Sequence, residues 1–356
     1  MKKKLNSWTM RLFAGFNKNI GVDLGTVNTQ IYVKGEGIVI NDPTIVAVNN
    51  KTGQIVAIGG EAKKMLDRTP QHITVVKPLQ GGVISDFEMA EEVVKHQLRS
   101  LDEGIFHRCG LAVLGVPTNL TEVERKSAED VLISAGASRV YLVEEPIAAA
   151  LGARLPIEDP AANMIIDIGG GTTEMAIISV GGAVISRSLK VAGEKLNDDI
   201  VKFVKDEFQL AIGEPTAEEI KIKIGSAIPL DERLEMLIRG RDLGSGLPKE
   251  VTVKNSHVRL AVAKSLKTIA DAARSIIEDA PPELVGDILE RGIHLCGGGS
   301  LLRGLDRYLE RETTVKTNLI DDSQTCVIRG LGIVVEDFVK YEKLLNSQAK
   351  PRDIVI

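Results

Sequence analysis

Two segments of the chain combine an aspartate with glycines and small hydroxyl residues, a composition suited to binding a polyphosphate. Asp23 begins the segment DLGTVNT and Asp167 begins DIGGGTT, and the two align without a gap at an offset of 144 residues. Apolar residues precede and follow each segment, which predicts two β-hairpins. Small residues at a hairpin tip let backbone N–H groups approach an anion closely, and a nearby carboxylate can hold hydrated Mg²⁺. The pair predicts two similar domains that grip one polyphosphate from both sides.

Composition predicts a cytoplasmic protein of about two domains. The chain has 356 residues, 44% of them hydrophobic and 26% charged, which is ordinary for a globular protein. Its net charge of −5 argues against nucleic acid as a partner. The three cysteines, Cys109, Cys296 and Cys326, are far apart and are interpreted as reduced core thiols. No apolar run reaches the roughly 18 residues that would span a bilayer.

The first 18 residues have a different character from the rest of the chain. They are basic and contain no acidic residue, and their large apolar residues recur at spacings of three and four: Leu5, Trp8, Leu12 and Phe16. This spacing predicts one face of a helix. Apolar anchors with flanking lysines favour a helix lying in an anionic membrane interface. A basic tail, or a helix docked on its own protein, is the alternative.

Between and after the hairpins, strands alternate with helices, which favours an α/β fold. Capping-box patterns predict helices that begin at Thr121 and Thr216. The sequence EEP at 144–146 predicts the start of an alanine-rich helix, and the run GGGS at 297–300 predicts a turn into a helix over 301–309. A last helix is expected over 332–345. Residues 34–75 and 191–254 are interpreted as two small insertions.

Several other nucleotide or hydrolase sites are excluded by their missing motifs. The chain contains no GxxxxGK[ST], which excludes a P-loop, and its glycine runs do not spell the GxGxxG of a dinucleotide site. There is no GxSxG nucleophile elbow.

Taken in order, the first Asp hairpin, the Glu-Pro helix, the second Asp hairpin, the Glu-x-x-Lys helix and the GGGS turn resemble the actin, Hsp70 and sugar-kinase ATPases. Residues 19–340 are similar to the MreB family of bacterial actins nearly throughout. The stretches that carry this resemblance are DLGTVNTQIYVKGEGIVIND, RTPQHITVVKPLQGGVISDF, VEEPIAAALGA, IDIGGGTTEMAIISVGG, IGEPTAEEIKIKIGSA and PPELVGDILERGIHLCGGGSLLRGLD.

The resemblance implies two duplicated domains, each with a small inserted subdomain, flanking a nucleotide cleft. The first domain would comprise subdomain IA (19–33, 76–155 and 325–347) and subdomain IB (34–75). The second would comprise subdomain IIA (156–190 and 255–324) and subdomain IIB (191–254). Residues 1–18 would form the membrane-binding segment.

The resemblance also implies roles for individual residues, with ATP and Mg²⁺ as cofactors. Asp23 and Asp167 would hold Mg²⁺ through water, and Glu145, assisted by Thr172, would orient the attacking water. Glu145 is preferred to Glu144 because it directly precedes the proline. The remaining nucleotide contacts would be Thr26, Val27, Asn28, Gly169, Gly170, Gly171, Thr172, Glu218, Glu219, Lys221, Gly297, Gly298, Gly299, Ser300 and Leu301.

The implied function is a cytoskeletal filament on the inner face of the cell membrane that organises cell-wall elongation and maintains rod shape. Hydrolysis of ATP would be slow in the monomer and stimulated in the filament. Ile105 and Phe106, in a loop, would form a second membrane contact beside the N-terminal helix. Further copies of the chain, anionic lipid and RodZ-like membrane proteins would be its partners.

Two departures from the family pattern are present, and several alternatives stay open. Val27 stands where the family usually has Ala, and Gln30 where it usually has Leu; the bulkier Val27 is expected to slow nucleotide exchange or tilt the hairpin without abolishing binding.

A small-metabolite kinase of the same superfamily is one alternative function. Another bacterial actin, either an MreB paralogue or a segregation filament, is a second. The sequence does not separate ATP from GTP.

Overall fold

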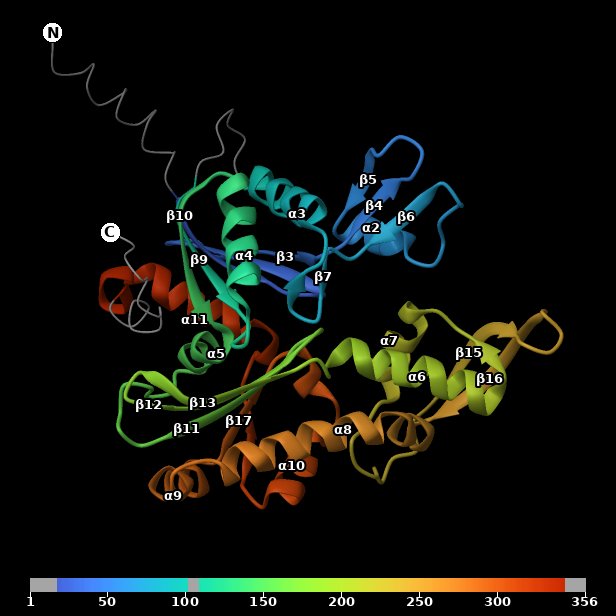
Figure 1. The fold of residues 1–356 in the computed structure, drawn as a ribbon. Coiled ribbons are helices and arrows are strands. Elements are labelled where there is room, and N and C mark those ends of the chain that lie inside the picture. The colour runs from blue at the N-terminus through green and yellow to red at the C-terminus, as the bar shows by residue number, and fades with distance from the viewer. Residues whose placement is uncertain (1–17, 102–108, 343–356) are drawn as a thin grey trace, which may run out of the picture.

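Two five-stranded sheets with the same strand order form the centre of the protein (Figure 1). The computed structural model describes residues 18–101 and 109–342. The first sheet has the order β10-β9-β1-β2-β3 and the second β18-β17-β11-β12-β13. In both, three strands form an antiparallel meander and the others add in parallel. This duplication confirms the expected α/β fold. The strands are β1 (Lys18–Leu24), β2 (Asn28–Val33), β3 (Gly37–Pro43), β9 (Cys109–Val116), β10 (Ala137–Glu144), β11 (Asn163–Ile168), β12 (Thr173–Ser179), β13 (Gly182–Leu189), β17 (Ile293–Cys296) and β18 (Thr317–Leu319).

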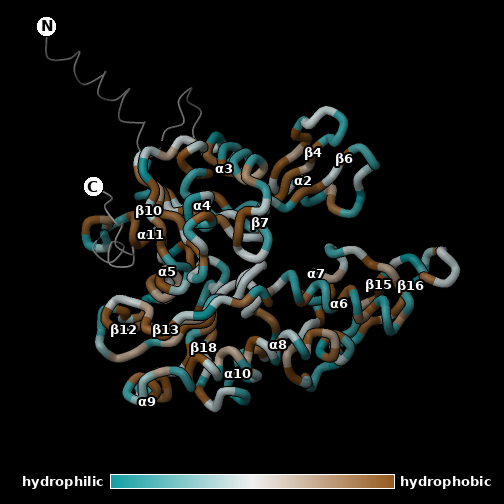
Figure 2. The backbone as a smooth tube through the Cα atoms, viewed as in Figure 1, coloured by the Kyte–Doolittle hydropathy of each residue, from teal (hydrophilic) through white to brown (hydrophobic). Residues whose placement is uncertain are grey.

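Helices cover the outer faces of both sheets and fill the space between them. Helix α5 (Glu145–Gly152) and helix α11 (Cys326–Glu336) lie between the two sheets, where α5 packs on β11 and α11 on β1. Figure 2 shows hydrophobic residues along both helices. The outer helices are α3 (Phe87–Ser100) and α4 (Glu122–Ser134) on the first half, and α8 (Asn255–Glu278), α9 (Pro282–Arg291) and α10 (Leu305–Thr313) on the second.

The two central helices approach each other unusually closely because glycines lie at their crossing. A Cβ atom on Gly152 would lie 1.8 Å from the carbonyl oxygen of Cys326, and one on Gly330 would lie 1.7 Å from that of Ala148. One hydrophobic core, which contains Val113 of β9 and Ile165 of β11, surrounds this crossing. The two halves therefore share a core rather than meeting only through loops.

A small sheet extends from the first half. It has the order β5-β4-β6, and helix α2 packs against it. Strand β3 lies within the expected insertion 34–75 but pairs with β2 of the large sheet, so the small sheet begins only at β4. These elements are β4 (Val46–Asn49), β5 (Ile55–Ile58), α2 (Gly60–Met65) and β6 (Ile73–Val76), followed by the hairpin of β7 (Leu79–Gln80) and β8 (Val83–Ile84).

The insertion of the second half contains two helices and a three-stranded sheet. They are α6 (Gly193–Phe208), β14 (Leu210–Ala211), α7 (Glu214–Ile224), β15 (Glu235–Asp242) and β16 (Pro248–Lys254). The capping box predicted at Thr216 is wrong, because α7 begins two residues earlier with Gly213 as its N-cap. Pro215 fits the first turn, where no intrahelical N–H bond is needed, and Asp67 accepts the N–H of Glu214 at 3.1 Å.

Other local predictions are confirmed or corrected. The capping box at Thr121 is present, with reciprocal bonds to Glu124. The helix expected over 301–309 begins only at Leu305, because a 3₁₀ turn, η1 (Gly298–Leu301), and the left-handed Gly304 precede it. The helix expected over 332–345 begins earlier, at Cys326, after the 3₁₀ turn η2 (Ser323–Thr325), and α11 ends at Glu336.

Candidate functional site

A cleft of about 500 Å³ opens between the two halves, and both Asp-Gly hairpins line it. From the first hairpin it is lined by Asp23, Thr26, Val27 and Asn28, and from the second by Asp167, Gly169, Gly170, Gly171 and Thr172. The two turns close in the same way: Gly25 N–H donates to the carbonyl of Asn28 at 3.1 Å, and Gly169 N–H to that of Thr172 at 2.9 Å. The structure thus brings together the two segments that the sequence aligned.

The tips of the hairpins touch each other, which explains their glycines. A Cβ atom on Gly170 would lie 2.3 Å from Cγ2 of Val27, and one on Gly171 would lie 2.3 Å from Oγ1 of Thr26. That Thr26 hydroxyl also accepts the N–H of Gly82 at 3.0 Å. Only residues without side chains fit the second tip, so its N–H groups stay accessible to an anion.

Buried and half-buried carboxyl groups lie close together at the cleft. Burial raises the pKa of Asp23 to about 7, and burial together with the charges of Asp23 and Glu174 raises that of Asp167 to about 7. The pKa of Glu145 lies well above its usual value because of burial and the charges of Glu174, Asp23 and Asp167. Such a group of buried acids is stabilised when a cation enters the cleft.

The donor set fits a hydrated divalent cation. Carboxylate oxygens are the ligands that Mg²⁺ prefers, and Mg²⁺ usually keeps several of its waters. Within residues 18–101 and 109–342, no three Asp, Glu, His or Cys side chains are arranged to bind a metal directly.

The structure separates the two neighbouring glutamates that the sequence left as candidates. Glu145 is at the first position of α5, followed by Pro146, and it lines the cleft. Glu144 instead lies 3.7 Å from the guanidinium of Arg125 and does not line the cleft. This geometry favours Glu145 as the group that faces a bound nucleotide.

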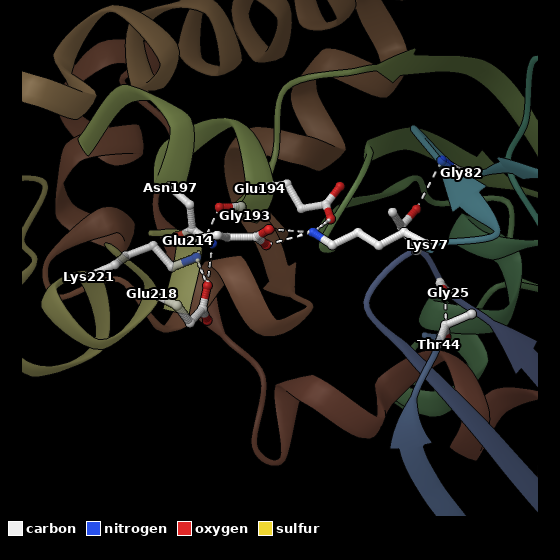
Figure 3. Close-up of polar contacts among 11 residues, drawn as sticks. Gly25, Thr44, Lys77, Gly82, Gly193, Glu194, Asn197, Glu214, Glu218 and Lys221 are labelled. Carbon is white, nitrogen blue, oxygen red and sulfur yellow. Dashed lines mark hydrogen bonds and ion pairs between the residues drawn. The ribbon is translucent and has the colours of Figure 1, made fainter. Parts of the chain in front are cut away.

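On the far side of the cleft, α6 and α7 present a hydrogen-bonded group of side chains (Figure 3). Glu218 accepts from the side-chain amide of Asn197 at 2.5 Å and from the ammonium of Lys221 at 2.9 Å. Lys221 also donates to the carbonyl of Gly193 at 2.9 Å. This network fixes a carboxylate with free lone pairs at the cleft wall, which suits it to accept hydrogen bonds from sugar hydroxyl groups.

Two of the predicted contacts do not face the cleft. Glu219 points away from it and pairs with Lys223 at 2.6 Å, and Ser300 is buried with its hydroxyl donating to the carbonyl of Gly297. Gly297, Gly298, Gly299 and Leu301 do line the cleft.

The predicted membrane residues Leu5, Trp8, Leu12, Phe16, Ile105 and Phe106 lie outside the described residues. No helix in the described part of the chain is long and apolar enough to cross a membrane.

Two further residues at or beside the cleft were not singled out from the sequence. Lys77, just after β6, reaches across the cleft mouth to Glu194 at 2.8 Å and to Glu214 at 2.6 Å (Figure 3). Glu174 is buried beside the carboxyl cluster and accepts from Thr118 and Ser188. In the alignment of the two segments at the 144-residue offset, Glu174 corresponds to Gln30, and this correspondence could have pointed to Glu174. No local sequence pattern distinguishes Lys77.

Duplicated sheets, paired hairpins and a carboxyl-lined cleft define an actin-like protein. A family model described as MreB/Mbl protein matches residues 17–343. The chain belongs to the MreB/Mbl family, and it is a bacterial actin-like cytoskeletal protein with a role in cell shape.

Relatives and solved structures agree with this assignment. Cell shape-determining protein Mbl of Bacillus subtilis is 43% identical over 92% of this chain and 98% of its own. Cell shape-determining protein MreB of Escherichia coli K12 is 43% identical over 92% of this chain and 96% of its own. The structure of MreB5 of Spiroplasma citri bound to AMPPNP has a TM-score of 0.88 and 41% identity, covering 93% of this chain and 99% of that one. A MamK double helical filament, at 22% identity and a TM-score of 0.76, covers 90% of this chain and 99% of its own and shares the fold.

Proposed function

We propose that this chain binds ATP with Mg²⁺ between its two hairpins, closes its cleft and polymerises into filaments on the inner face of the cell membrane. The contact between the two hairpin tips at Gly170 and Val27 carries the proposal, since one polyphosphate there would touch both halves. The relative from Spiroplasma citri was solved with AMPPNP and with ADP. Anionic lipid, further copies of the chain and RodZ-like membrane proteins are the proposed partners.

In the proposed site, each half supplies backbone N–H groups to the phosphates. When bound, Mg²⁺ would neutralise phosphate charge, with Asp23 and Asp167 accepting hydrogen bonds from its waters. Glu145 would accept a proton from a water molecule, and Thr172 would help to position that water. We propose that hydrolysis is slow in the monomer and speeds up when filament contacts reposition Glu145 against that water.

The proposed division of the molecule places these groups on separate bodies. Subdomains IA and IIA would each carry one hairpin, and the small sheets around β4 and β15 would form IB and IIB. Asp67 and Lys77 of the first half contact α7 of the second. These contacts would help to hold the two halves together when a nucleotide is bound, and so set the surface offered to the next copy.

Pelleting with anionic liposomes, with and without ATP and Mg²⁺, tests the proposal when the pellets are viewed by electron microscopy. We expect ATP-dependent filaments on the liposomes. A variant that lacks residues 1–17 should lose or weaken membrane binding while it keeps all of the described structure. A second variant, with Ile105 and Phe106 both changed to Asp, tests the loop contact separately. Absence of filaments under every nucleotide and lipid condition would contradict the proposal, and phosphate release that depends on an added sugar would favour a metabolite kinase.

A further inference from the structure

Two polar side chains at the floor of the cleft have oxygen atoms without hydrogen-bond partners. Gln30 of β2 and Ser323 of η2 are 5% and 3% exposed, and both line the cleft. Neither Oε1 of Gln30 nor Oγ of Ser323 has a hydrogen-bond partner among the described residues. A buried polar atom without a partner is unfavourable, so these oxygens suggest a ligand that forms hydrogen bonds with them.

The orientation of the Gln30 amide is fixed by its other end. Its Nε2 donates to the backbone carbonyl of Gln324 at 3.3 Å. The reversed amide would place two oxygens against each other, since a carbonyl cannot donate. The acceptor, Oε1, therefore remains on the side without a protein partner.

Both residues lie beside the aspartates of the cleft. Gln30 pairs with Asp23 across β1 and β2. The carbonyl of Ser323 accepts the N–H of Gly297 at 3.0 Å, and a Cβ atom on Gly297 would lie 2.2 Å from Oδ1 of Asp167. Two side-chain oxygens without partners, one an amide acceptor and one a hydroxyl that can also accept, thus adjoin two carboxyl groups from opposite halves.

A hydrated divalent cation matches this arrangement better than a phosphate does. Phosphate oxygens are acceptors at neutral pH and provide nothing to the oxygen of an amide, whereas water bound to a metal donates strongly. Amide, hydroxyl and carboxylate oxygens are also the groups that hard cations prefer. A leucine at position 30, the usual residue in the resembling family, offers no such oxygen.

We propose that Gln30 and Ser323 accept hydrogen bonds from the water shell of a divalent cation that Asp23 and Asp167 hold through water. This inference rests on the proposed function and adds two positioning residues to its metal site. Ser323 and Gln324 lie on the segment that returns the chain from β18 to α11. The metal's water shell therefore contacts the first sheet and the crossover segment together, and links metal occupancy to the relative position of the two halves.

Titration with MgCl₂ of the full chain bound to a fluorescent ATP analogue tests this proposal. We expect Gln30→Leu and Ser323→Ala each to raise the Mg²⁺ concentration needed for half-maximal tightening about tenfold, the lower end of what outer-shell metal partners usually contribute. Affinity for the nucleotide in EDTA should stay within twofold of the original chain. Gln30→Glu keeps an acceptor oxygen and should retain the Mg²⁺ response.

Matched controls come from the same structure. Gln97 and Ser226 are also buried and carry partnerless side-chain oxygens, but neither lines the cleft. Gln97→Leu and Ser226→Ala should leave the Mg²⁺ titration unchanged. The inference would be overturned if both cleft variants left the Mg²⁺ titration unchanged, or if they lost nucleotide affinity equally in EDTA. It would also be overturned if Gln30→Glu weakened the Mg²⁺ response as much as Gln30→Leu does. Failure of the original chain to bind the nucleotide would instead overturn the proposed function.

Discussion

Glu145 and Glu144 are adjacent in the chain but lie in different environments. Glu145 lines the cleft beside its other carboxyl groups, whereas Glu144 lies near Arg125. We predict that Glu145→Gln retains ATP binding and lowers phosphate release by about 10²–10⁴-fold, the usual contribution of a positioned acid or base. Phosphate release and equilibrium nucleotide binding would be measured side by side. Glu144→Gln is the matched control and should stay near the original rate; normal turnover in Glu145→Gln would refute the assigned role.

His294 on β17 provides a test of pH dependence away from the hairpins. Burial, with a smaller contribution from the charge of Arg291, lowers the pKa of His294 below its usual value, and its Nδ1 has no partner among the described residues. The unfolded chain therefore takes up a proton near pH 6.5, before the folded chain does. Stability that is present above about pH 6.5 is lost as the pH falls toward the lower folded pKa.

We predict that His294→Asn reduces the loss of stability between pH 7.5 and pH 5.5. Thermal unfolding at a series of pH values would measure it. The exposed His72, changed to Asn in the same way, should leave the pH profile unaltered. If stability falls equally steeply with pH in His294→Asn and in the original chain, this histidine does not titrate as argued.

At the scale of elements, the crossing of α5 and α11 depends on the absence of side chains at two positions. A Cβ atom on Gly330 would lie 1.7 Å from the carbonyl oxygen of Ala148, which is backbone and cannot move aside cheaply. We predict that Gly330→Ala lowers the free energy of unfolding by at least about 2 kcal/mol, as overpacking does. Chemical denaturation would measure the change.

The control for this substitution is a helical glycine with free space around it. A Cβ atom on the exposed Gly286 of α9 would meet nothing within 4 Å. Gly286→Ala should therefore raise stability by about 0.4–1 kcal/mol. Equal effects of the two substitutions would mean that the helix crossing tolerates a wider separation.

Local patterns in the sequence predicted those elements whose signals are local. The repeated Asp-Gly segments and the capping box at Thr121 need only neighbouring residues to act. Predictions failed where a distant contact decides where an element begins. Helix α7 begins at Glu214, where Asp67 accepts the first backbone N–H of the helix, and not at the capping box expected at Thr216. Lys77 was missed for the same reason, since its partner Glu194 is 117 residues away.

At the scale of the whole molecule, Lys77 links the two halves at the mouth of the cleft. Its ammonium group is bonded to both Glu194 and Glu214, and its side chain is 28% exposed. Burial tends to lower the pKa of Lys77, but bonds to the two glutamates raise it overall. Hydrogen bonds between charged groups contribute about 1.5–3 kcal/mol, so we predict that Lys77→Met speeds nucleotide dissociation about tenfold.

Stopped-flow release of a fluorescent nucleotide would measure this rate. Lys64→Met removes an exposed lysine whose one ion pair among the described residues is with Glu61 on the same helix, and it should leave the rate unchanged. Similar rates of nucleotide release from the two variants would show that the bonds of Lys77 to Glu194 and Glu214 do not hold the cleft closed.

The position of α11 in the chain has a consequence for synthesis on the ribosome. This helix packs on β1, β2 and β9, where Leu331 approaches Gly21 and Gly332 approaches the ring of Tyr32. The strands it covers are complete by residue 116, yet residues 326–336 emerge only after the entire second half. Helix α5 reaches β9 and β10 earlier, but throughout that interval the part of the first sheet that α11 covers lacks its helix. We therefore expect the growing chain to expose apolar surface and to benefit from chaperones that bind during translation.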